Sequence, residues 1–118
     1  MLTANEIAAI AVKALDAKMA QDIKLLRTTD VTILADYFII CTAGSEVHLK
    51  TLSDELARVL GEQGETLLRV EGARANQWAL LDYGSLVVHL FLREAREFYT
   101  LERLWSDAED VDIEPILK

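Results

Sequence analysis

Residues 78–91 read Trp-Ala-Leu-Leu-Asp-Tyr-Gly-Ser-Leu-Val-Val-His-Leu-Phe, two apolar runs on either side of Asp82-Tyr83-Gly84. Short apolar runs bounded by turn residues are typical of strands, so we expect strands over 78–81 and 86–91. A two-residue turn would force Tyr83 to positive φ. We therefore expect a three-residue loop with its glycine in the left-handed region.

This loop length fixes which side chains share a face of the expected hairpin. Side chains alternate between the two faces of a strand. A change of one residue in the length of the loop therefore moves the side chains of one strand to the opposite face relative to those of its partner strand. With a three-residue loop, Trp78 and Leu80 lie on one face and His89 and Phe91 on the other. One of Trp78 and His89 would then belong to the core.

Helical and strand patterns alternate along the rest of the chain. Thr3-Ala4-Asn5-Glu6 is a capping-box pattern at the start of an expected helix. Ser45 follows Gly44 as the N-cap of a second helix, which Gly61 or Gly64 ends. Expected helices cover about 4–20, 46–60 and 94–105, expected strands cover 23–27, 37–42, 67–71, 78–81 and 86–91, and expected irregular segments cover 28–35 and 72–76.

The predicted order is therefore αββαβββα, an α/β fold with a mixed β-sheet flanked by helices. A chain of 118 residues forms one domain. We expect it to span 1–118, with an acidic C-terminal tail over about 106–118 in which 111–113 adds a short edge strand. Three strands are apolar on both faces and only three helices are expected to cover them. Some apolar surface should remain for a partner or a second copy.

The composition limits the class of partner and the compartment. Twelve basic and twenty acidic residues give a net charge of −8, which opposes general nucleic-acid binding and favours a basic protein partner. Cys41 is the single cysteine, which excludes an internal disulfide framework and favours a reducing cytoplasm. No basic region precedes the first apolar residues and no window of 18 apolar residues exists. We expect neither a signal peptide nor a membrane span.

The residues that could support catalysis have simpler structural roles. A Gly-Ser pair after a strand is similar to the start of a nucleotidyltransferase site, but that chemistry needs a nearby Asp-x-Asp pair for its metal ions. The one such pair, Asp110-Val111-Asp112, lies at the far end of the chain. Cys41 is expected to be a buried core thiol and His48 an exposed helical residue. We predict no catalytic residue, no metal site and no cofactor.

Aromatic and arginine side chains are the better candidates for a binding surface. Residues 78–105 hold both tryptophans and two of the three tyrosines. Tyr83 lies at a turn tip, where burial is difficult, and His89 is either a packed histidine or a partner contact. Arg96, Tyr99 and Arg103 share one side of the third expected helix. That side is either an interface or a solvated face with internal salt bridges.

Five blocks of residues in collinear order resemble the ribosome silencing factor family, also called Iojap-like. The blocks are Ala35-Asp36-Tyr37-Phe38-Ile39-Ile40-Cys41, Glu71-Gly72, Trp78-Ala79-Leu80-Leu81-Asp82-Tyr83-Gly84, Val87-Val88-His89-Leu90-Phe91 and Arg96-Glu97-Phe98-Tyr99-Thr100-Leu101-Glu102-Arg103-Leu104-Trp105. The resemblance extends from about residue 7 to residue 105. The last dozen residues carry no signal of the family.

The resemblance implies a nucleotidyltransferase-like fold without the catalytic acids, and a protein that is not an enzyme. It implies binding to the large ribosomal subunit through protein number fourteen of the intersubunit face, which hinders joining of the small subunit. It allows a minor contact with ribosomal RNA, and it implies a homodimer when the protein is free. The partner-binding residues that we carry over or add are Trp78, Leu80, Asp82, Tyr83, His89, Arg96 and Tyr99.

Two other functions stay open at this point. A diverged nucleotidyltransferase-like enzyme would bind or turn over nucleotides with Mg²⁺. A dimeric protein-interaction adaptor would be retained on something other than the large subunit.

Overall fold

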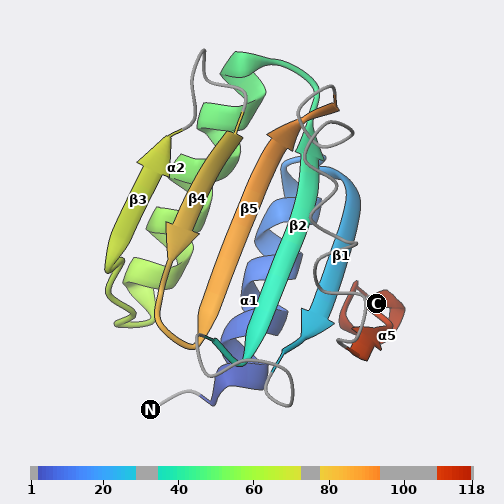
Figure 1. The fold of residues 1–118 in the computed structure, drawn as a ribbon, viewed down its shortest axis with the longest axis vertical. Helices are drawn as coiled ribbons and strands as arrows, with labels where there is room; N and C mark the ends of the chain where they lie inside the picture. The colour runs from blue at the N-terminus through green and yellow to red at the C-terminus, as the bar shows by residue number, and fades with distance from the viewer. Residues whose placement is uncertain (1–2, 29–34, 73–77, 94–108, 118) are drawn as a thin grey trace.

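A mixed six-stranded sheet organises the chain, with the strand order β3-β4-β5-β2-β1-β6 (Figure 1). The structure is a computed structural model that describes residues 3–28, 35–72, 78–93 and 109–117. β2 pairs with β5 in parallel, and the other neighbouring strands pair antiparallel. The prediction of a single α/β domain with a mixed sheet is confirmed.

The order of elements also follows the prediction as far as β5. The elements are α1 Ala4–Ala17, β1 Gln21–Arg27, β2 Tyr37–Ala43, α2 Glu46–Glu62, β3 Arg69–Gly72, β4 Trp78–Asp82, β5 Leu86–Leu92, β6 Glu109–Val111 and α5 Glu114–Leu117. The helix expected at 94–105 lies outside the described residues. None of the described helices has both the length and the hydropathy to span a lipid bilayer.

A local signal in the sequence sets the start of α1, whereas its end differs from the expectation. The capping box is present, because Thr3 Oγ1 accepts from the Glu6 amide at 3.1 Å and Glu6 Oε1 accepts from the Thr3 amide at 3.0 Å. The helix ends at Ala17, three residues before the expected end at Ala20. Met19 has a φ of 66° there, and a side chain in this left-handed conformation cannot continue the helix.

The start and end of α2 are also readable in the sequence. Ser45 caps the helix as expected, since its hydroxyl oxygen accepts from the His48 amide at 3.1 Å. Of the two candidate stop glycines, Gly61 remains helical and Gly64 takes the left-handed conformation, with a φ of 83°. The Glu65 amide then donates to the carbonyl of Leu60 at 3.0 Å, which closes the end of the helix.

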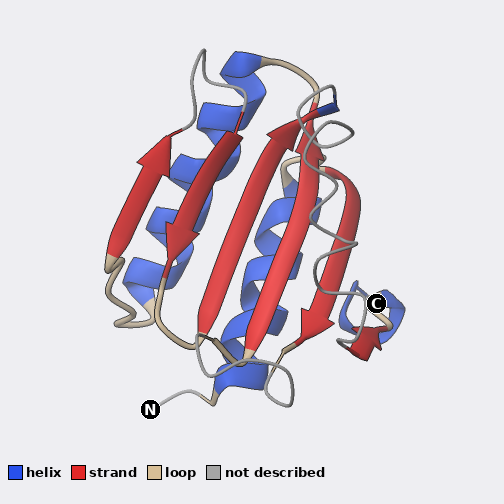
Figure 2. Cartoon of the chain, viewed as in Figure 1, coloured by secondary structure: helices blue, strands red, loops and turns tan. Residues whose placement is uncertain are grey.

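Both long helices lie on one face of the sheet (Figure 2). Their apolar sides and the facing strand residues form the larger core cluster, which includes Leu15, Ile39, Leu52, Leu56, Val88 and Leu90, all at most 1% exposed. Cys41 belongs to the same cluster and is buried, as expected of a core thiol. The opposite face of the sheet carries a second, smaller cluster.

The expected register of the β4–β5 hairpin is wrong, because the turn is one residue shorter than expected and begins at Gly84 instead of Asp82. The strands pair Asp82 with Val87 and Trp78 with Phe91. The Tyr83 amide donates to the Leu86 carbonyl at 2.8 Å, so the turn is the two-residue Gly84-Ser85 and not a three-residue loop. Gly84 does take the left-handed conformation expected of it, with a φ of 87°.

The physical reason is that a two-residue turn beginning at Gly84 suits these residues better than a three-residue loop beginning at Asp82. Glycine then supplies the positive φ at the first turn position, and Tyr83 keeps a strand conformation. Trp78 therefore lies on the same face as His89, and not opposite to it. The candidate residues on β4 therefore share a face with other residues of β5 than expected.

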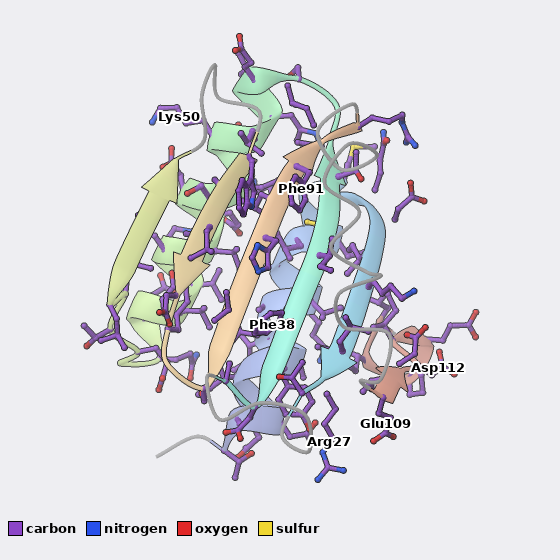
Figure 3. All side chains as sticks on the ribbon, in the orientation of Figure 1. Arg27, Phe38, Lys50, Phe91, Glu109 and Asp112 are labelled. Carbon is purple, nitrogen blue, oxygen red and sulfur yellow. The ribbon has the colours of Figure 1, made fainter. Side chains whose placement is uncertain are left out.

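The acidic C-terminal tail takes part in the sheet. β6 pairs antiparallel with β1 at 109–111, two residues earlier than the expected strand. Two exposed ion pairs accompany this pairing, Lys24–Asp110 at 3.6 Å and Arg27–Glu109 at 3.5 Å. In Figure 3, Arg27 and Glu109 lie beside each other at the lower end of β1.

His48 joins the two long helices, a role that the sequence did not indicate. Its Nδ1 accepts from the Gly44 amide at 2.8 Å, and its Nε2 lies 2.7 Å from the carbonyl oxygen of Lys18 at the end of α1. Because Nδ1 accepts, Nε2 carries the proton and donates to that carbonyl. The ring thus connects the start of α2 to the C-cap of α1, and it is not the free surface residue we expected.

We predict that His48→Ala lowers the free energy of unfolding by about 1–2 kcal/mol, because two partly exposed hydrogen bonds are lost. Urea denaturation followed by circular dichroism measures this. Lys50→Ala is the matched control on the same helix turn, since its exposed pair with Asp54 at 3.3 Å contributes less than about 0.5 kcal/mol. Equal losses in the free energy of unfolding for the two substitutions would contradict a stabilising connection between the helices through His48.

Candidate partner-binding face

One face of the sheet points away from α1 and α2, and we call it the aromatic face. The cross-strand register places on it, in order, Trp78, Leu80 and Asp82 of β4, Val87, His89 and Phe91 of β5, and Phe38 and Ile40 of β2. Figure 3 shows Phe38 and Phe91 on the side of the sheet turned to the viewer, with the two long helices behind it. The face therefore joins side chains from three adjacent strands.

Three rings on this face are stacked along the hairpin. The Trp78 and Phe91 rings have centroids 5.3 Å apart and are inclined by 13°. His89 lies 6.2 Å from Phe91 at 10° and 5.9 Å from Trp78 at 23°. Phe38 adds a tilted contact to His89 at 5.4 Å. Offset aromatic contacts of this kind stabilise each other beyond the area they bury, so the rings form a rigid group.

A hydrogen bond fixes the tryptophan within this group. Trp78 Nε1 donates to His89 Nδ1 at 3.2 Å. His89 Nδ1 is therefore unprotonated, and Nε2 carries the hydrogen of the neutral ring. His89 Nε2 is buried and forms no hydrogen bond with any residue that the structure describes. The indole of Trp78 is oriented by a neutral histidine below it.

Burial keeps His89 neutral at physiological pH. The side chain is 5% exposed, and desolvation lowers its pKa from 6.5 to about 4. Protonation at Nδ1 would also remove the acceptor of the Trp78 hydrogen bond. His89 is a packed histidine that supports the face from within.

The structure separates the seven predicted binding residues into three groups. Trp78, Leu80 and Asp82 are half-buried on the aromatic face. His89 lies on the same face but is buried, and Tyr83 is 6% exposed in the helix-side core. Arg96 and Tyr99 lie outside the described residues.

Tyr83 and Asp82 both have structural roles at the turn. The Tyr83 hydroxyl is buried and has no hydrogen bond within the described part of the chain, and burial raises the pKa of this phenol. Asp82 Oδ1 accepts from the Gly84 amide at 2.8 Å, which holds the backbone in the tight turn. Asp82 keeps a second carboxylate oxygen on the half-buried side chain, where a partner could contact it.

Phe38, Ile40, Val87 and Phe91 complete the aromatic face and were not among the predicted site residues. Phe91 and Ile40 are fully buried, so they support the face instead of contacting a partner. Because β2 and β5 are apolar on both faces, the sequence pattern of these strands did not single them out. The incorrect hairpin register concealed their relation to Trp78.

The described residues show no arrangement suited to catalysis. Within residues 3–28, 35–72, 78–93 and 109–117, no three His, Cys, Asp or Glu side chains cluster as metal ligands would. Ser45 caps α2, while Asp110 pairs with Lys24 and Asp112 accepts from the Glu114 amide at 3.0 Å. The serine and the Asp-x-Asp pair each have a local structural partner.

We predict that His89 makes stability depend on pH. A histidine whose folded pKa is about 4 binds fewer protons than the unfolded chain between pH 6.5 and 4. The folded state therefore loses up to about 3 kcal/mol relative to pH 7 as the pH falls through this window, and nothing above it. Urea denaturation at pH 7 and pH 4.5 measures the loss.

His89→Gln is the reference for this measurement, because the amide oxygen can still accept from Trp78 and does not titrate. Carboxylates that titrate in the same window affect both proteins equally. The difference between the two proteins isolates His89. Identical pH dependence in wild type and variant would contradict a buried neutral histidine.

Comparison with known proteins places this chain and its fold in a family. The family described as "Ribosomal silencing factor during starvation" matches residues 1–118. The "Ribosomal silencing factor RsfS" of Halalkalibacterium halodurans is 37% identical over 113 residues, which cover 96% of this chain and 97% of that protein. A solved structure of protein CV0518 from Chromobacterium violaceum superposes with a TM-score of 0.85, at 32% identity over 89% of this chain and 88% of that chain.

A longer relative carries a name that refers to the ribosome directly. "Mitochondrial assembly of ribosomal large subunit protein 1" of Mus musculus is 34% identical over 98 residues, which cover 80% of this chain and 43% of the mouse protein. The family match over the whole chain and the close bacterial relative agree with each other and with the superposed structure. The chain belongs to the RsfS family of ribosomal silencing factors, which are not enzymes.

Proposed function

We propose that this silencing factor binds the large ribosomal subunit through protein number fourteen of the intersubunit face. The bound domain occupies space that the small subunit needs, so the two subunits cannot join and translation is repressed. The observation that carries the proposal is a row of three half-buried side chains, Trp78, Leu80 and Asp82, above a rigid aromatic stack. The name of the mouse relative, which refers to the large subunit, supports the choice of partner.

The row on β4 has the properties of an interface anchor. Trp78, Leu80 and Asp82 alternate with core residues, so they repeat at about 6–7 Å along one face of the strand. The hydrogen bond to His89 and the stack on Phe91 hold the indole in place before binding. An anchor that is already ordered loses little entropy when a partner covers it. A few such side chains can carry most of the binding free energy.

The net charge of the chain favours a basic partner. The chain carries a net charge of −8, which would attract a basic ribosomal protein and repel ribosomal RNA. We therefore assign RNA at most a minor contact. The second carboxylate oxygen of Asp82 is a candidate acceptor for a lysine or arginine of the partner.

The buried residues of the predicted set act from inside the domain. His89 orients Trp78, and Tyr83 shapes the turn that presents Asp82. Arg96 and Tyr99 remain proposed contacts from the segment after β5. We also propose that the free protein is a homodimer and that it acts in the cytoplasm.

The direct test is sedimentation of the purified protein with separated ribosomal subunits through a sucrose gradient. The proposal predicts comigration with large subunits only, and fewer joined ribosomes when small subunits are added. Comigration with small subunits, or normal joining in the presence of saturating protein, would contradict it.

We predict that Trp78→Ala weakens binding to the large subunit by tenfold or more, because truncating a central aromatic anchor costs about 2 kcal/mol or more. The matched control is Tyr37→Ala, which truncates a partly buried aromatic side chain that packs toward the helices. Circular dichroism checks that both variants fold. Trp78→Phe, which keeps a ring on Phe91, should bind better than Trp78→Ala. Wild-type affinity in a folded Trp78→Ala variant would remove this residue from the site.

We predict that Asp82→Asn weakens binding severalfold at low salt and that the difference shrinks near 0.5 M salt, where charges at a surface are screened within about 4–5 Å. The amide oxygen can still accept from Gly84, so the turn remains intact. Asp54→Asn removes the same charge from α2 and should leave binding unchanged. A defect of equal size at all salt concentrations would show that Asp82 does not act through its charge.

A further inference from the structure

β3 is an edge of the sheet, and no strand among the described residues pairs with its outer side (Figure 1). Alternate residues of an edge strand direct their backbone N–H and C=O groups outward, where another strand can pair with them. Two apolar side chains are exposed at this edge. Leu68, which directly precedes β3, is 64% exposed, and Val70 is 54% exposed. The edge therefore offers both the backbone groups and the apolar surface that an added strand uses.

Val70 faces the layer of helices, but that layer does not cover it. Val70 pairs with Leu81, and directly paired residues of two strands point to the same face of a sheet. Leu81 is buried in the helix-side core, whereas Val70 is largely exposed. The cover by the helices therefore ends between β4 and β3. α2 is the helix nearest to this edge, so a strand added outside β3 would extend beyond the flank of α2 (Figure 1).

A groove with a volume of about 440 Å³ lies between the first half of α2 and the start of β4. Val47, Leu49 and Ala79 contribute apolar side chains to it. Gly72 of β3 pairs with Ala79, so β3 is the next strand outward from the groove. A strand added outside β3 would lie about 10 Å from β4, which is two strand spacings. A long side chain on its helix side, such as that of lysine or arginine, can reach the groove from there.

The groove lies on the flank of α2 that faces away from α1. His48 marks the other flank, because it bonds to the Lys18 carbonyl at the end of α1. Glu46, Lys50 and Asp54 line the groove, and their i, i+4 spacing places them in one row along α2. In Figure 3, Lys50 points outward on the side of the molecule where β3 lies. The row therefore lies on the β3 side of α2 and not next to the neighbouring helix.

Charge in this row favours a basic side chain. Lys50 pairs with Asp54 at 3.3 Å, so these two charges balance. Glu46 forms no ion pair within the part of the chain that the structure describes, and its carboxylate leaves the groove net negative. The net charge of −8 attracts a basic protein in the same sense at longer range. A lysine or arginine side chain in the groove would give Glu46 a partner.

We propose that the β3 edge and the groove beside α2 form a docking site for an extended segment of a basic protein. The segment adds antiparallel to β3, the pairing that is slightly more stable per residue than a parallel one. Its helix-side residues are a basic residue at the groove, followed at alternate positions by apolar residues beside Val70 and Leu68. The expected pattern is basic-x-apolar-x-apolar, where x is any residue.

This site is separate from the row on β4 that is proposed to contact the ribosome. Trp78, Leu80 and Asp82 lie on the aromatic face, whereas the docked side chains lie on the helix side of the sheet. A silencing factor bound to the large subunit could thus hold a second protein at its edge. The inference goes beyond the proposed function and does not depend on it.

Nuclear magnetic resonance of the isotope-labelled protein tests the site with a synthetic peptide and without ribosomes. The probe is the blocked peptide acetyl-Thr-Arg-Thr-Val-Thr-Val-Thr-amide, which carries the expected pattern. We expect a dissociation constant of about 0.1–1 mM, because a short flexible peptide loses entropy when it is ordered. The amide resonances of Leu68, Val70 and Ser53 should shift, whereas that of the Trp78 indole should not. The peptide with the reverse order of residues has the same composition and charge and should bind several times more weakly.

Two substitutions and their controls assign the contacts. Val70→Lys replaces the exposed apolar side chain by a charge of the same sign as that of the peptide and should weaken binding by about tenfold or more. Glu46→Gln should weaken binding severalfold at low salt and less at high salt. Asp16→Asn removes the same charge from the exposed side of α1, and Trp78→Ala alters the aromatic face. Both controls should bind the peptide as the wild type does, and circular dichroism checks that all four variants fold.

Weaker binding to Val70→Lys and Glu46→Gln, with unchanged binding to both controls, supports the site. Binding of the reversed peptide that equals or exceeds that of the probe overturns the antiparallel pairing. Loss of binding to Trp78→Ala would assign the peptide to the aromatic face and overturn the site. Peptide binding that declines as the protein concentration rises would show a second copy at the edge, which also overturns it. The absence of any shift at about 5 mM peptide, above the expected dissociation constant, overturns the proposal outright.

Discussion

The pairing of β4 with β5 is the constraint on which the candidate site depends. The Tyr83–Leu86 hydrogen bond closes a two-residue turn, and Gly84 supplies the positive φ that this turn requires. Because side chains alternate between the two faces of a strand, this turn determines which face each residue of β4 and β5 occupies. Trp78 must face the same side as His89, and Ala79 and Leu81 of β4 must face the helices. A hairpin with one residue more would place the tryptophan in the helix-side core.

The fixed register divides the sheet into two faces with different tasks. The helix side holds most of the apolar core, including Ile39 and Cys41 of β2, and it carries most of the stability of the domain. The aromatic face holds a smaller cluster in which a neutral histidine orients a half-buried tryptophan. A partner that covers Trp78 and Leu80 meets side chains that the core already holds in position.

Local signals in the sequence predicted the helices and strands well, whereas contacts between residues far apart in the chain could not be predicted. The Thr3 capping box, the Ser45 cap and the apolar stripes of both helices depend on neighbours within four residues, and the structure confirms them. The prediction of the hairpin register failed because a change of one residue in the length of the turn reverses the faces of one strand relative to the other. His48 and Lys18 are 30 positions apart, so no local pattern could reveal their contact. Of the site, the residue types on β4 were predictable from the resemblance, whereas the burial of Tyr83 and His89 required the three-dimensional packing.

The central claim is that the aromatic face, and not the helical layer, contacts the large subunit. Hydroxyl-radical footprinting of the protein alone and bound to large subunits, read by mass spectrometry, tests it most directly. The account predicts protection of Trp78 and Leu80 on binding, while Val47, which is 77% exposed on α2, remains equally reactive. Protection of Val47 with unchanged reactivity at Trp78 and Leu80 would contradict it.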